Sequence, residues 1–369
     1  MKEIKAIVDA YTTIDFNKNR AALATVVRVE GSSYRRTGAR MLVKDDGTYL
    51  GGISGGCLEG DALKRCRMAI EANEPSIITY DTTQDDGYQI GAGLGCNGVI
   101  DVLFTPLSES DEKNPVRQLS TLTGIRESRI FITVTAQENC SVSQGTSFLF
   151  VDDQHFKNEF PDKDFTTEIL QAIHDVSESQ VSLSSIHTKG IKELKLFVEV
   201  IQPVIHLVVF GGNYDVYPLM RIAKELGWKI SLITNTSKAD KTMYNTATEV
   251  YSSKGVAMPD LDDRTAAILM THDFRSDKLH LQELLNSKLG YIGMLGPRKR
   301  AEKIFSELAE AGIPISEMES KRIFAPCGLD IGANTPEEIA LSIVAEIKAH
   351  FAGRSGSALR LRETPIHSE

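Results

Sequence analysis

The chain has 369 residues, and its 41 basic and 50 acidic side chains give a formal net charge of −9. A hydrophobic fraction of 41% and a charged fraction of 25% are typical of a soluble globular protein, and at ~100–200 residues per domain the length predicts two or three domains. The acidic balance argues against nucleic-acid binding, and the lack of a signal peptide or of ~20 consecutive apolar residues argues against secretion and membrane insertion, so we expect a cytosolic protein.

The first half of the chain predicts a mixture of helices and strands. Apolar residues recur at helical spacing near the start and again after Cys57, and apolar runs predict strands between and after these helices. Asp46-Gly47 predicts a hairpin turn, and Asp152-Asp153 predicts a second turn. The expected elements are helices over 4–11, from 58 onward and over 166–177, and strands over 22–30, 39–43, 48–50, 99–105, 129–135, 147–151 and 194–201.

From Pro203 onward, strands of the buried type alternate with helices. The last helix carries a complete start signal, with Thr335 as the N-cap, Pro336 in the first turn and Glu338 three residues after the cap. Strands are expected over 204–210, 228–233, 265–270 and 291–295. Such alternation predicts a parallel sheet covered by helices on both faces. We therefore predict an α/β protein with an N-terminal mixed α/β domain over 1–202 and a C-terminal Rossmann-like domain over 203–369.

Two loops in the first half combine glycine with cysteine. Ser54-Gly55-Gly56-Cys57 precedes a helix, and Gly95-Cys96-Asn97 precedes a strand. Glycines let backbone N–H groups approach a ligand, and a helix start favours both a bound anion and a reactive thiolate at Cys57. The two loops predict a shared ligand cleft, against the structural alternative of tight turns with small packed cysteines. The sequence contains no Cys-x-x-Cys pair, so it predicts neither a zinc site nor a disulfide framework. We expect core positions for Cys66, Cys140 and Cys327.

Basic side chains near these loops and in the second half are candidate anion ligands. Arg35, Arg36 and Arg40 flank the first glycine loop, and their forked donors suit phosphate or carboxylate. Arg298 stands at a helix start, where it could bind a phosphate. A solvated surface cluster is the alternative for both groups.

The loop after the first strand of the second half resembles the beginning of a dinucleotide fingerprint. The full motif needs glycine where Asn213 and Val216 stand, and the acid expected ~20 residues later for a ribose hydroxyl is missing. Both departures argue against tight NAD binding. The helix start could still bind a phosphate or a nucleotide, and its expected ligands are Gly211, Gly212 and Asn213.

His272-Asp273 follows the strand over 265–270, at the edge where open α/β sheets bind ligands. His272 could act as an acid, a base or a metal ligand, and a structural histidine is the alternative.

Read together, these loops resemble the XdhC/CoxI family of molybdenum-hydroxylase maturation factors over nearly the whole chain. The sequence departs from the family pattern in two places, with Tyr34 where the family usually has proline and Gly211-Gly212-Asn213 where it usually has Gly-Ala-Gly. The segments that carry the resemblance are Gly31–Met41, Gly52–Glu59, Gly93–Gly98, Phe210–Gly212, Thr271–Asp273, Tyr291–Arg300, Gly328–Ala340 and Gly353–Gly356.

The resemblance implies a protein that binds molybdenum cofactor, protects it, assists its sulfuration with a cysteine desulfurase and delivers it to a xanthine dehydrogenase or a related hydroxylase. It implies that Cys57 or Cys96 contacts molybdenum or relays sulfur, and that the arginines or the Rossmann helix start bind the cofactor's phosphate. A homodimer is expected because most soluble oligomers are symmetric dimers.

Three other functions remain open from the sequence alone. An NAD(P)-dependent oxidoreductase would use the Rossmann half. A nucleotidyl-transferring enzyme would hold a metal ion through Asp273 and Asp330. A structural adaptor without a small ligand would leave the paired glycine and cysteine loops unexplained. We expect a chaperone rather than a free-standing enzyme.

Overall fold

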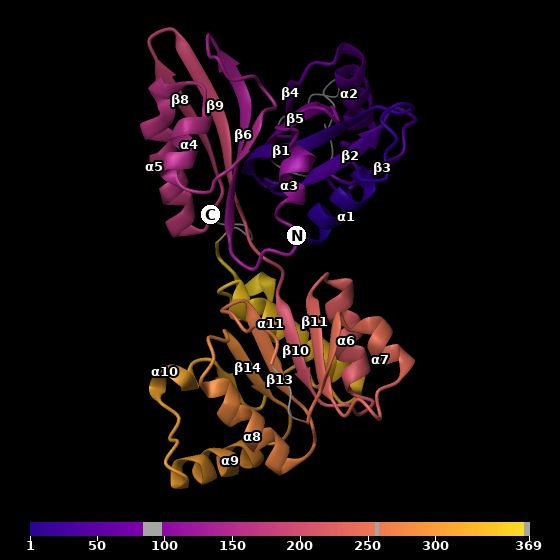
Figure 1. The fold of residues 1–369 in the computed structure, drawn as a ribbon, viewed down its shortest axis with the longest axis vertical. Helices are drawn as coiled ribbons and strands as arrows, with labels where there is room; N and C mark the ends of the chain where they lie inside the picture. Colours follow the sequence, from indigo (N-terminus) through magenta and orange to yellow (C-terminus); the bar gives the residue numbers. More distant parts are fainter. Residues whose placement is uncertain (84–97, 255–257, 365–369) are drawn as a thin grey trace. The chain divides into compact units, whose positions relative to one another are not determined.

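A computed structural model describes residues 1–83, 98–254 and 258–364, and Figure 1 shows its ribbon. The described chain forms two compact units, one from Glu3 to Gln202 and a second that begins at Pro203. None of the described helices is long and apolar enough to span a bilayer.

The first sheet of the first unit is antiparallel, with the strand order β3-β2-β1-β5-β4. Its central strand β1 is buried on both faces. Ala22, Ala24 and Val26 pack with the buried face of α2, whereas Ala21 and Leu23 pack with α1 and α3. The elements are α1 (Lys2–Tyr11), β1 (Ala21–Gly31), β2 (Arg40–Lys44), β3 (Tyr49–Gly51), α2 (Glu59–Ala72), β4 (Ser76–Asp81), β5 (Gly98–Leu107) and α3 (Pro115–Ser120).

A second antiparallel sheet completes the first unit, with the order β7-β6-β9-β8 and with α4 and α5 beside it (Figure 1). Asp152 does not form the expected turn but caps α4, because its Oδ1 accepts a hydrogen bond from the His155 N–H at 2.8 Å. Buried phenylalanines fill the space between this helix, α5 and the sheet. The elements are β6 (Arg129–Glu138), β7 (Ser147–Leu149), α4 (Asp153–Glu159), η1 (Lys163–Phe165), α5 (Thr166–Ser179), β8 (Leu183–Lys189) and β9 (Lys192–Ile201).

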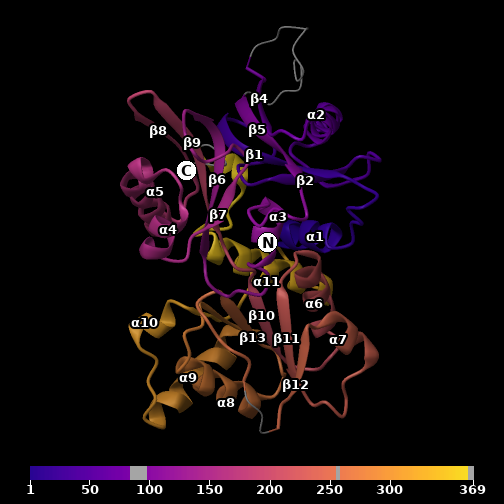
Figure 2. The same cartoon turned by 45° about the horizontal axis from the view of Figure 1, so that its top comes forward.

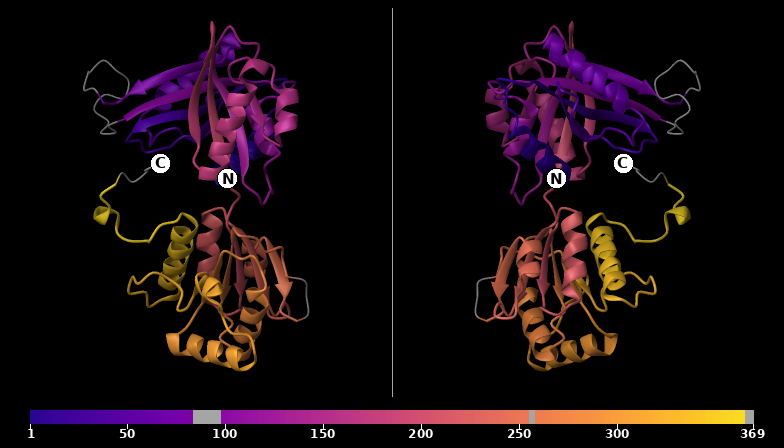
Figure 3. Two further views of the ribbon diagram at one scale, coloured as in Figure 1. Left: turned by 90° about the vertical axis from the view of Figure 1, so that its left-hand side faces the viewer. Right: turned by 90° about the vertical axis from the view of Figure 1, so that its right-hand side faces the viewer.

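The second unit contains a parallel sheet in the order β12-β11-β10-β13-β14-β15, and Figure 2 shows β10, β11 and β13 side by side. The helices α6 and α11 pack on one face, as Figure 3 also shows for α11 in yellow, and α8 and α9 pack on the other. This arrangement confirms the predicted fold class. The strands are β10 (His206–Phe210), β11 (Lys229–Thr234), β12 (Glu249–Ser252), β13 (Thr265–Leu269), β14 (Tyr291–Met294) and β15 (Ile323–Phe324).

The last long helix begins where its capping signal predicts. The Thr335 side chain accepts from the Glu338 N–H at 3.3 Å, and the Glu338 carboxylate accepts from the Thr335 N–H at 2.9 Å. The helices of this unit are α6 (Val216–Glu225), α7 (Lys241–Thr246), α8 (Phe274–Leu285), α9 (Arg298–Glu310), α10 (Glu317–Ser320), α11 (Pro336–Phe351) and the short η2 (Leu359–Leu361).

The topology of the parallel sheet fixes where a ligand can bind. The chain leaves β10 for β11 on one side and later returns to β13 on the other, so the connections after β10 and β13 diverge at their carboxyl ends. Such a switch point forms the ligand crevice of open α/β sheets. Gly211-Gly212 follows β10, and His272-Asp273 lies just beyond β13.

Candidate functional site

The glycine loop before α2 is closed around the carboxylate of Glu59. Its Oε1 accepts from the Ser54 N–H at 2.8 Å, and its Oε2 accepts from the Gly56 N–H at 3.0 Å and from the Ser54 hydroxyl. The Ser54 Oγ in turn accepts from the N–H groups of Cys57 and Leu58, each at 3.0 Å. The N–H groups of Ser54, Gly56, Cys57 and Leu58, at the loop where the sequence predicts an external anion, are therefore already bound to side chains of this chain.

Burial of the Glu59 carboxyl opposes its ionisation, but the hydrogen bonds from Ser54 and Gly56 outweigh that cost, and the net effect lowers its pKa. Glu59 is thus the anion at this helix start, where the helix dipole also favours negative charge. A second anion at the same position would meet its repulsion.

This closed loop presents one thiol outward. Cys57 is exposed, whereas Cys66 lies on the buried face of α2, where burial raises the pKa of its thiol to about 12. Cys140 and Cys327 are partly buried, and burial raises the pKa of the Cys327 thiol to about 12. Among the described cysteines, Cys57 is therefore the accessible nucleophile or metal ligand.

Residues 31–34 contact both this loop and the start of β5. The ring of Tyr34 packs on Gly55, where an added Cβ would lie 3.1 Å from Cδ1 of the tyrosine. Gly98 pairs with Gly31 in the sheet and closely approaches the Ser32 carbonyl. The predicted ligands Gly95, Cys96 and Asn97 precede Gly98 but lie outside the described residues.

The arginines near this loop bind carboxylates and carbonyls of the same unit. Arg35 forms an ion pair with Glu3, and Arg36 donates to the Gly31 carbonyl at 3.3 Å. For Arg40 the alternative of a solvated surface cluster is wrong, because its side chain is 2% exposed, and its forked donors bind the Glu199 carboxylate of this chain in a two-point ion pair.

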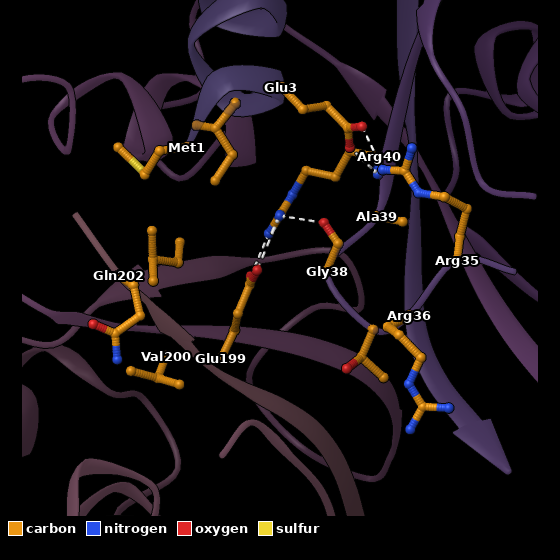
Figure 4. Close-up of a pocket in the computed structure, with 13 residues that line it drawn as sticks. Met1, Glu3, Arg35, Arg36, Gly38, Ala39, Arg40, Glu199, Val200 and Gln202 are labelled. Atoms are coloured by element: carbon orange, nitrogen blue, oxygen red, sulfur yellow. Dashed lines mark hydrogen bonds and ion pairs between the residues drawn. The ribbon is translucent and has the colours of Figure 1, made fainter. Parts of the chain in front are cut away.

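Figure 4 shows the pocket of about 430 Å³ that these groups line, with Arg36 extending away from the Arg40–Glu199 pair. Gly38 adopts φ +84°, and a Cβ there would lie 2.4 Å from Glu199 Oε1. Glycine is thus required for the Glu199 carboxylate to reach Arg40 across the two sheets. The Glu3 carboxylate also accepts from the Arg40 N–H at 2.9 Å, which fixes α1 to this network.

The glycine loop of the second unit is packed rather than open. A Cβ at Gly211 would lie 2.7 Å from the Met270 carbonyl oxygen, and one at Gly212 would lie 2.2 Å from Thr234 Oγ1. The two glycines therefore serve close approach between strand ends, and Asn213 is exposed beside them.

The start of α6 disfavours a phosphate. Its N-cap is Asp215, whose carboxylate carries the same charge as a phosphate, and Pro218 in the first turn has no N–H to donate. A dinucleotide's pyrophosphate would normally lie at this helix start. The geometry therefore adds to the sequence departures that argue against an NAD site.

Asp215 instead pairs with His272 at the switch point. The His272 Nε2 lies 2.6 Å from Asp215 Oδ2, and His272 adopts φ +60°. Both residues line a pocket of about 290 Å³. The structure thus brings His272 to the loop that follows β10, as the topology predicts.

Asp273 and Arg298 take no part in this pair. Asp273 caps α8 by accepting from the Ser276 N–H at 2.7 Å, a bond that lowers its pKa. Arg298 is exposed at the start of α9, and instead Arg300 points inward to pair with the buried Asp277 at 2.6 Å. No group of three or more His, Cys, Asp or Glu that could hold a metal ion occurs in the part of the chain that the structure describes.

Two residues that the sequence analysis did not single out define these loops. Glu59 follows Ser54 by five residues, and a carboxylate closely following a serine and glycines is a weak signal for self-capping. Asp215 is separated from His272 by 57 residues, so only the topology of the sheet brings the pair together.

Comparison with known proteins matches both units. The model of the XdhC and CoxI family matches residues 17–81, and that of the XdhC Rossmann domain matches residues 207–347. A protein of Bacillus subtilis (strain 168), named as a probable subunit of xanthine dehydrogenase, is 28% identical over 90% of this chain and 93% of its own length.

Two further relatives cover most of the chain. The molybdenum cofactor insertion chaperone PaoD of Escherichia coli (strain K12) is 24% identical over 89% of this chain and 82% of its own length. A crystal structure from Bacillus halodurans, described as a xanthine dehydrogenase, superposes with a TM-score of 0.72 at 26% identity and covers 97% of this chain and 98% of its own. With both family models matched in the order of the two units, the chain belongs to the XdhC and CoxI family.

Proposed function

We propose that this protein is a maturation factor for a molybdenum hydroxylase of the xanthine dehydrogenase type. It binds molybdenum cofactor as cargo, protects it, assists its sulfuration together with a cysteine desulfurase, and delivers it to the hydroxylase. It acts in the cytosol, as a homodimer, and as a chaperone rather than as a free-standing enzyme.

The relatives support the cargo and the client. PaoD, which is named as a molybdenum cofactor insertion chaperone, aligns with 89% of the chain. The Bacillus subtilis relative, whose name places it in a xanthine dehydrogenase, aligns with 90% of it. Together these names support a molybdenum hydroxylase as the protein that receives the cofactor.

The exposed thiol of Cys57 is the observation that carries the assignment of the site. Glu59 and Ser54 hold its backbone, so the thiol is presented from a fixed turn rather than from a loose loop. Gly56 beside it adopts φ +112°, and no described atom lies within 4 Å of a Cβ placed there. The side of the loop next to Cys57 is therefore open to a bulky ligand.

Cys57 would contact the molybdenum end of the cargo, since a thiolate is a good ligand for soft metals. The predicted partner thiol Cys96 stays a prediction. Arg35 and Arg36 also stay predicted ligands of the cofactor's phosphate, although their present partners would have to be exchanged for it. The thiol is thus better supported than the anion site.

Reconstitution of a client hydroxylase tests this function. Cofactor-free hydroxylase would be incubated anaerobically with cofactor and with wild type, Cys57→Ser or Cys140→Ser protein, and hydroxylase activity would be measured. We expect activation by the wild type and by Cys140→Ser, whose thiol lies in the connection between β6 and β7, and a loss of at least about tenfold with Cys57→Ser. Equal activation by all three proteins would remove Cys57 from the mechanism, and no activation by folded wild type would remove the function.

A further inference from the structure

The second sheet of the first unit ends in a strand whose outer edge is open. This strand, β8, pairs with β9 in a continuous antiparallel register from Leu183 to Lys189, and it is the last strand in the order β7-β6-β9-β8 (Figure 1). Among the described residues, only β9 forms backbone hydrogen bonds with β8. The outward N–H and C=O groups of β8 therefore form a template on which a further strand can pair.

The strand β8 lacks the features that usually protect an edge from pairing. Edge strands are commonly short, bulged, interrupted by proline or charged along their length. With seven residues, β8 is longer than the other described edge strands, which have two to six. It contains no proline, its register with β9 is free of bulges, and its one lysine, Lys189, is the last residue.

An apolar side chain stands exposed in the middle of this edge strand. Ile186 is 64% exposed, and Leu183 at the start of β8 is exposed as well. A β-branched side chain on an edge strand gains burial and cross-strand contacts when another strand is added beside it. The side chains and the backbone of β8 thus favour the same partner, which is an added strand.

The sequence of β8 is self-complementary in an antiparallel pairing. Ile186 is the middle residue of the strand, so a two-fold axis at this position places each Ile186 opposite the partner's Ile186. Lys189 then lies opposite a leucine, and no two like charges face each other. Across the axis, the other pairs are Ser184 with Thr188, Ser185 with His187 and Leu183 with Lys189.

This symmetry favours a second copy over a strand of another protein, which would not require β8 to match itself. We propose that β8 pairs with β8 of a second copy of this chain, around a two-fold axis at Ile186, and that the two four-stranded sheets thereby become continuous. The interface specifies the homodimer of the proposed function and rests on that part of it. It uses neither Cys57 nor the cofactor, so the two proposals can fail separately.

The length of the strand also sets the strength of the dimer. Seven residues span ~24 Å, and two such strands form a narrower contact than a standard interface of ~1,600 Å². The dimer should therefore dissociate on dilution rather than be permanent.

Sedimentation equilibrium of the full-length protein under reducing conditions, across a wide range of concentrations, tests this interface. Ile186→Lys places two lysines opposite each other at the axis, so we expect its dimer to dissociate at least about tenfold more readily than that of the wild type. The exposure of Ile186 lets the variant fold. Val151→Lys changes an exposed apolar residue just beyond β7, at the opposite edge of the same sheet, and should dimerise as the wild type does.

Oxidative cross-linking in the Cys57→Ser background tests the register. Residues that face each other across an antiparallel pair have Cα atoms ~4.5–5.5 Å apart, a separation that a disulfide can bridge. Ile186→Cys should therefore form a covalent dimer. Thr188→Cys lies on the same face, but its sulfur would be four residues, or ~14 Å along the strand, from its counterpart and should not cross-link.

A wild type that stays monomeric at every concentration would overturn the proposal. A dimer that Ile186→Lys does not weaken, or equal cross-linking of Ile186→Cys and Thr188→Cys, would also overturn it. If the wild type is monomeric and Ile186→Lys still abolishes activation of the hydroxylase, the edge binds the client instead of a second copy. A dimer that follows the expected pattern but activates no hydroxylase would support the interface and contradict the proposed function.

Discussion

The two glycine loops of this protein look alike in sequence but use their carboxylates differently. In the first unit, Glu59 accepts three hydrogen bonds from Ser54 and Gly56 and closes the loop on itself. In the second unit, Asp215 binds His272 through one oxygen and leaves the other buried without a hydrogen bond among the described residues. One carboxylate completes a turn, whereas the other stands at the rim of a pocket.

A glycine-rich loop before a helix is therefore not by itself an anion site in this protein. The chain supplies its own anion at both helix starts, and the two loops differ in how completely that carboxylate is hydrogen-bonded. A third carboxylate, that of the buried Glu199, is bound at both oxygens by Arg40, so we expect it to contribute most to stability. Replacement of each carboxylate by its amide should therefore lower the free energy of unfolding most at Glu199, less at Glu59 and least at Asp215.

Glu199→Gln should have the largest effect on stability. The Arg40 guanidinium would remain buried without its counter-charge, and we expect the free energy of unfolding to fall by about 3–5 kcal/mol in a denaturant titration. Glu193→Gln on the same strand breaks an exposed pair with Lys195 and should cost less than about 1 kcal/mol. Equal losses in the two variants would show that Arg40 and Glu199 are not buried in solution.

Glu59→Gln should have an intermediate effect. An amide can accept only part of the hydrogen bonds of the carboxylate, so we expect a loss of about 2 kcal/mol in the free energy of unfolding. Alkylation of Cys57 should become faster, since its turn is no longer held. Glu71→Gln at an exposed position of the same helix is the control, and an equally small effect of both substitutions would contradict the closed loop.

The dependence of stability on pH should identify the same carboxylate. The pKa of Glu59 is lowered on folding, so its contribution is complete above the unfolded value of 4.5 and is lost as the pH falls through the lower folded value. The wild type should therefore lose stability below pH 4.5 more steeply than Glu59→Gln does. Parallel profiles of the two proteins would rule out Glu59 as the anion of this loop.

Asp215→Asn should have the smallest effect, and its sign distinguishes the two loops. The substitution removes the negative charge of a carboxylate that has one buried oxygen without a partner among the described residues, and it weakens a half-exposed pair with His272. We expect a change within about 1 kcal/mol of the wild type, neutral or stabilising. A loss as large as that of Glu59→Gln in the same denaturant titration would mean that Asp215 is a structural carboxylate after all.

Much of the fold could be predicted because its signals are local. The alternation after Pro203 predicts the parallel sheet, and the Thr335, Pro336 and Glu338 pattern predicts the start of α11. Short elements were not predicted. The helix α4 has only seven residues, and its N-cap Asp152 is a residue type that is equally common in turns. The strand β8, whose residues are mostly exposed, lacks a clear hydrophobic pattern.

The candidate sites were less predictable because their partners are distant in the sequence. The position of Arg40 depends on Glu199, 159 residues later, and that of His272 depends on Asp215. The sequence showed that arginines and glycines gather near Cys57, but not that their donors were already in use. It located His272 correctly at the sheet edge because strand ends follow from periodicity, whereas its partner follows only from the order of the strands.

Anaerobic equilibrium binding of purified molybdenum cofactor tests most directly whether the two loops differ in function. Wild type, Cys57→Ser and Asp215→Asn would be compared after each is shown to be folded. We predict tight binding to the wild type, at least about tenfold weaker binding to Cys57→Ser, and unchanged binding to Asp215→Asn. Binding that is lost in Asp215→Asn and retained in Cys57→Ser would contradict the account, as would no binding to the folded wild type.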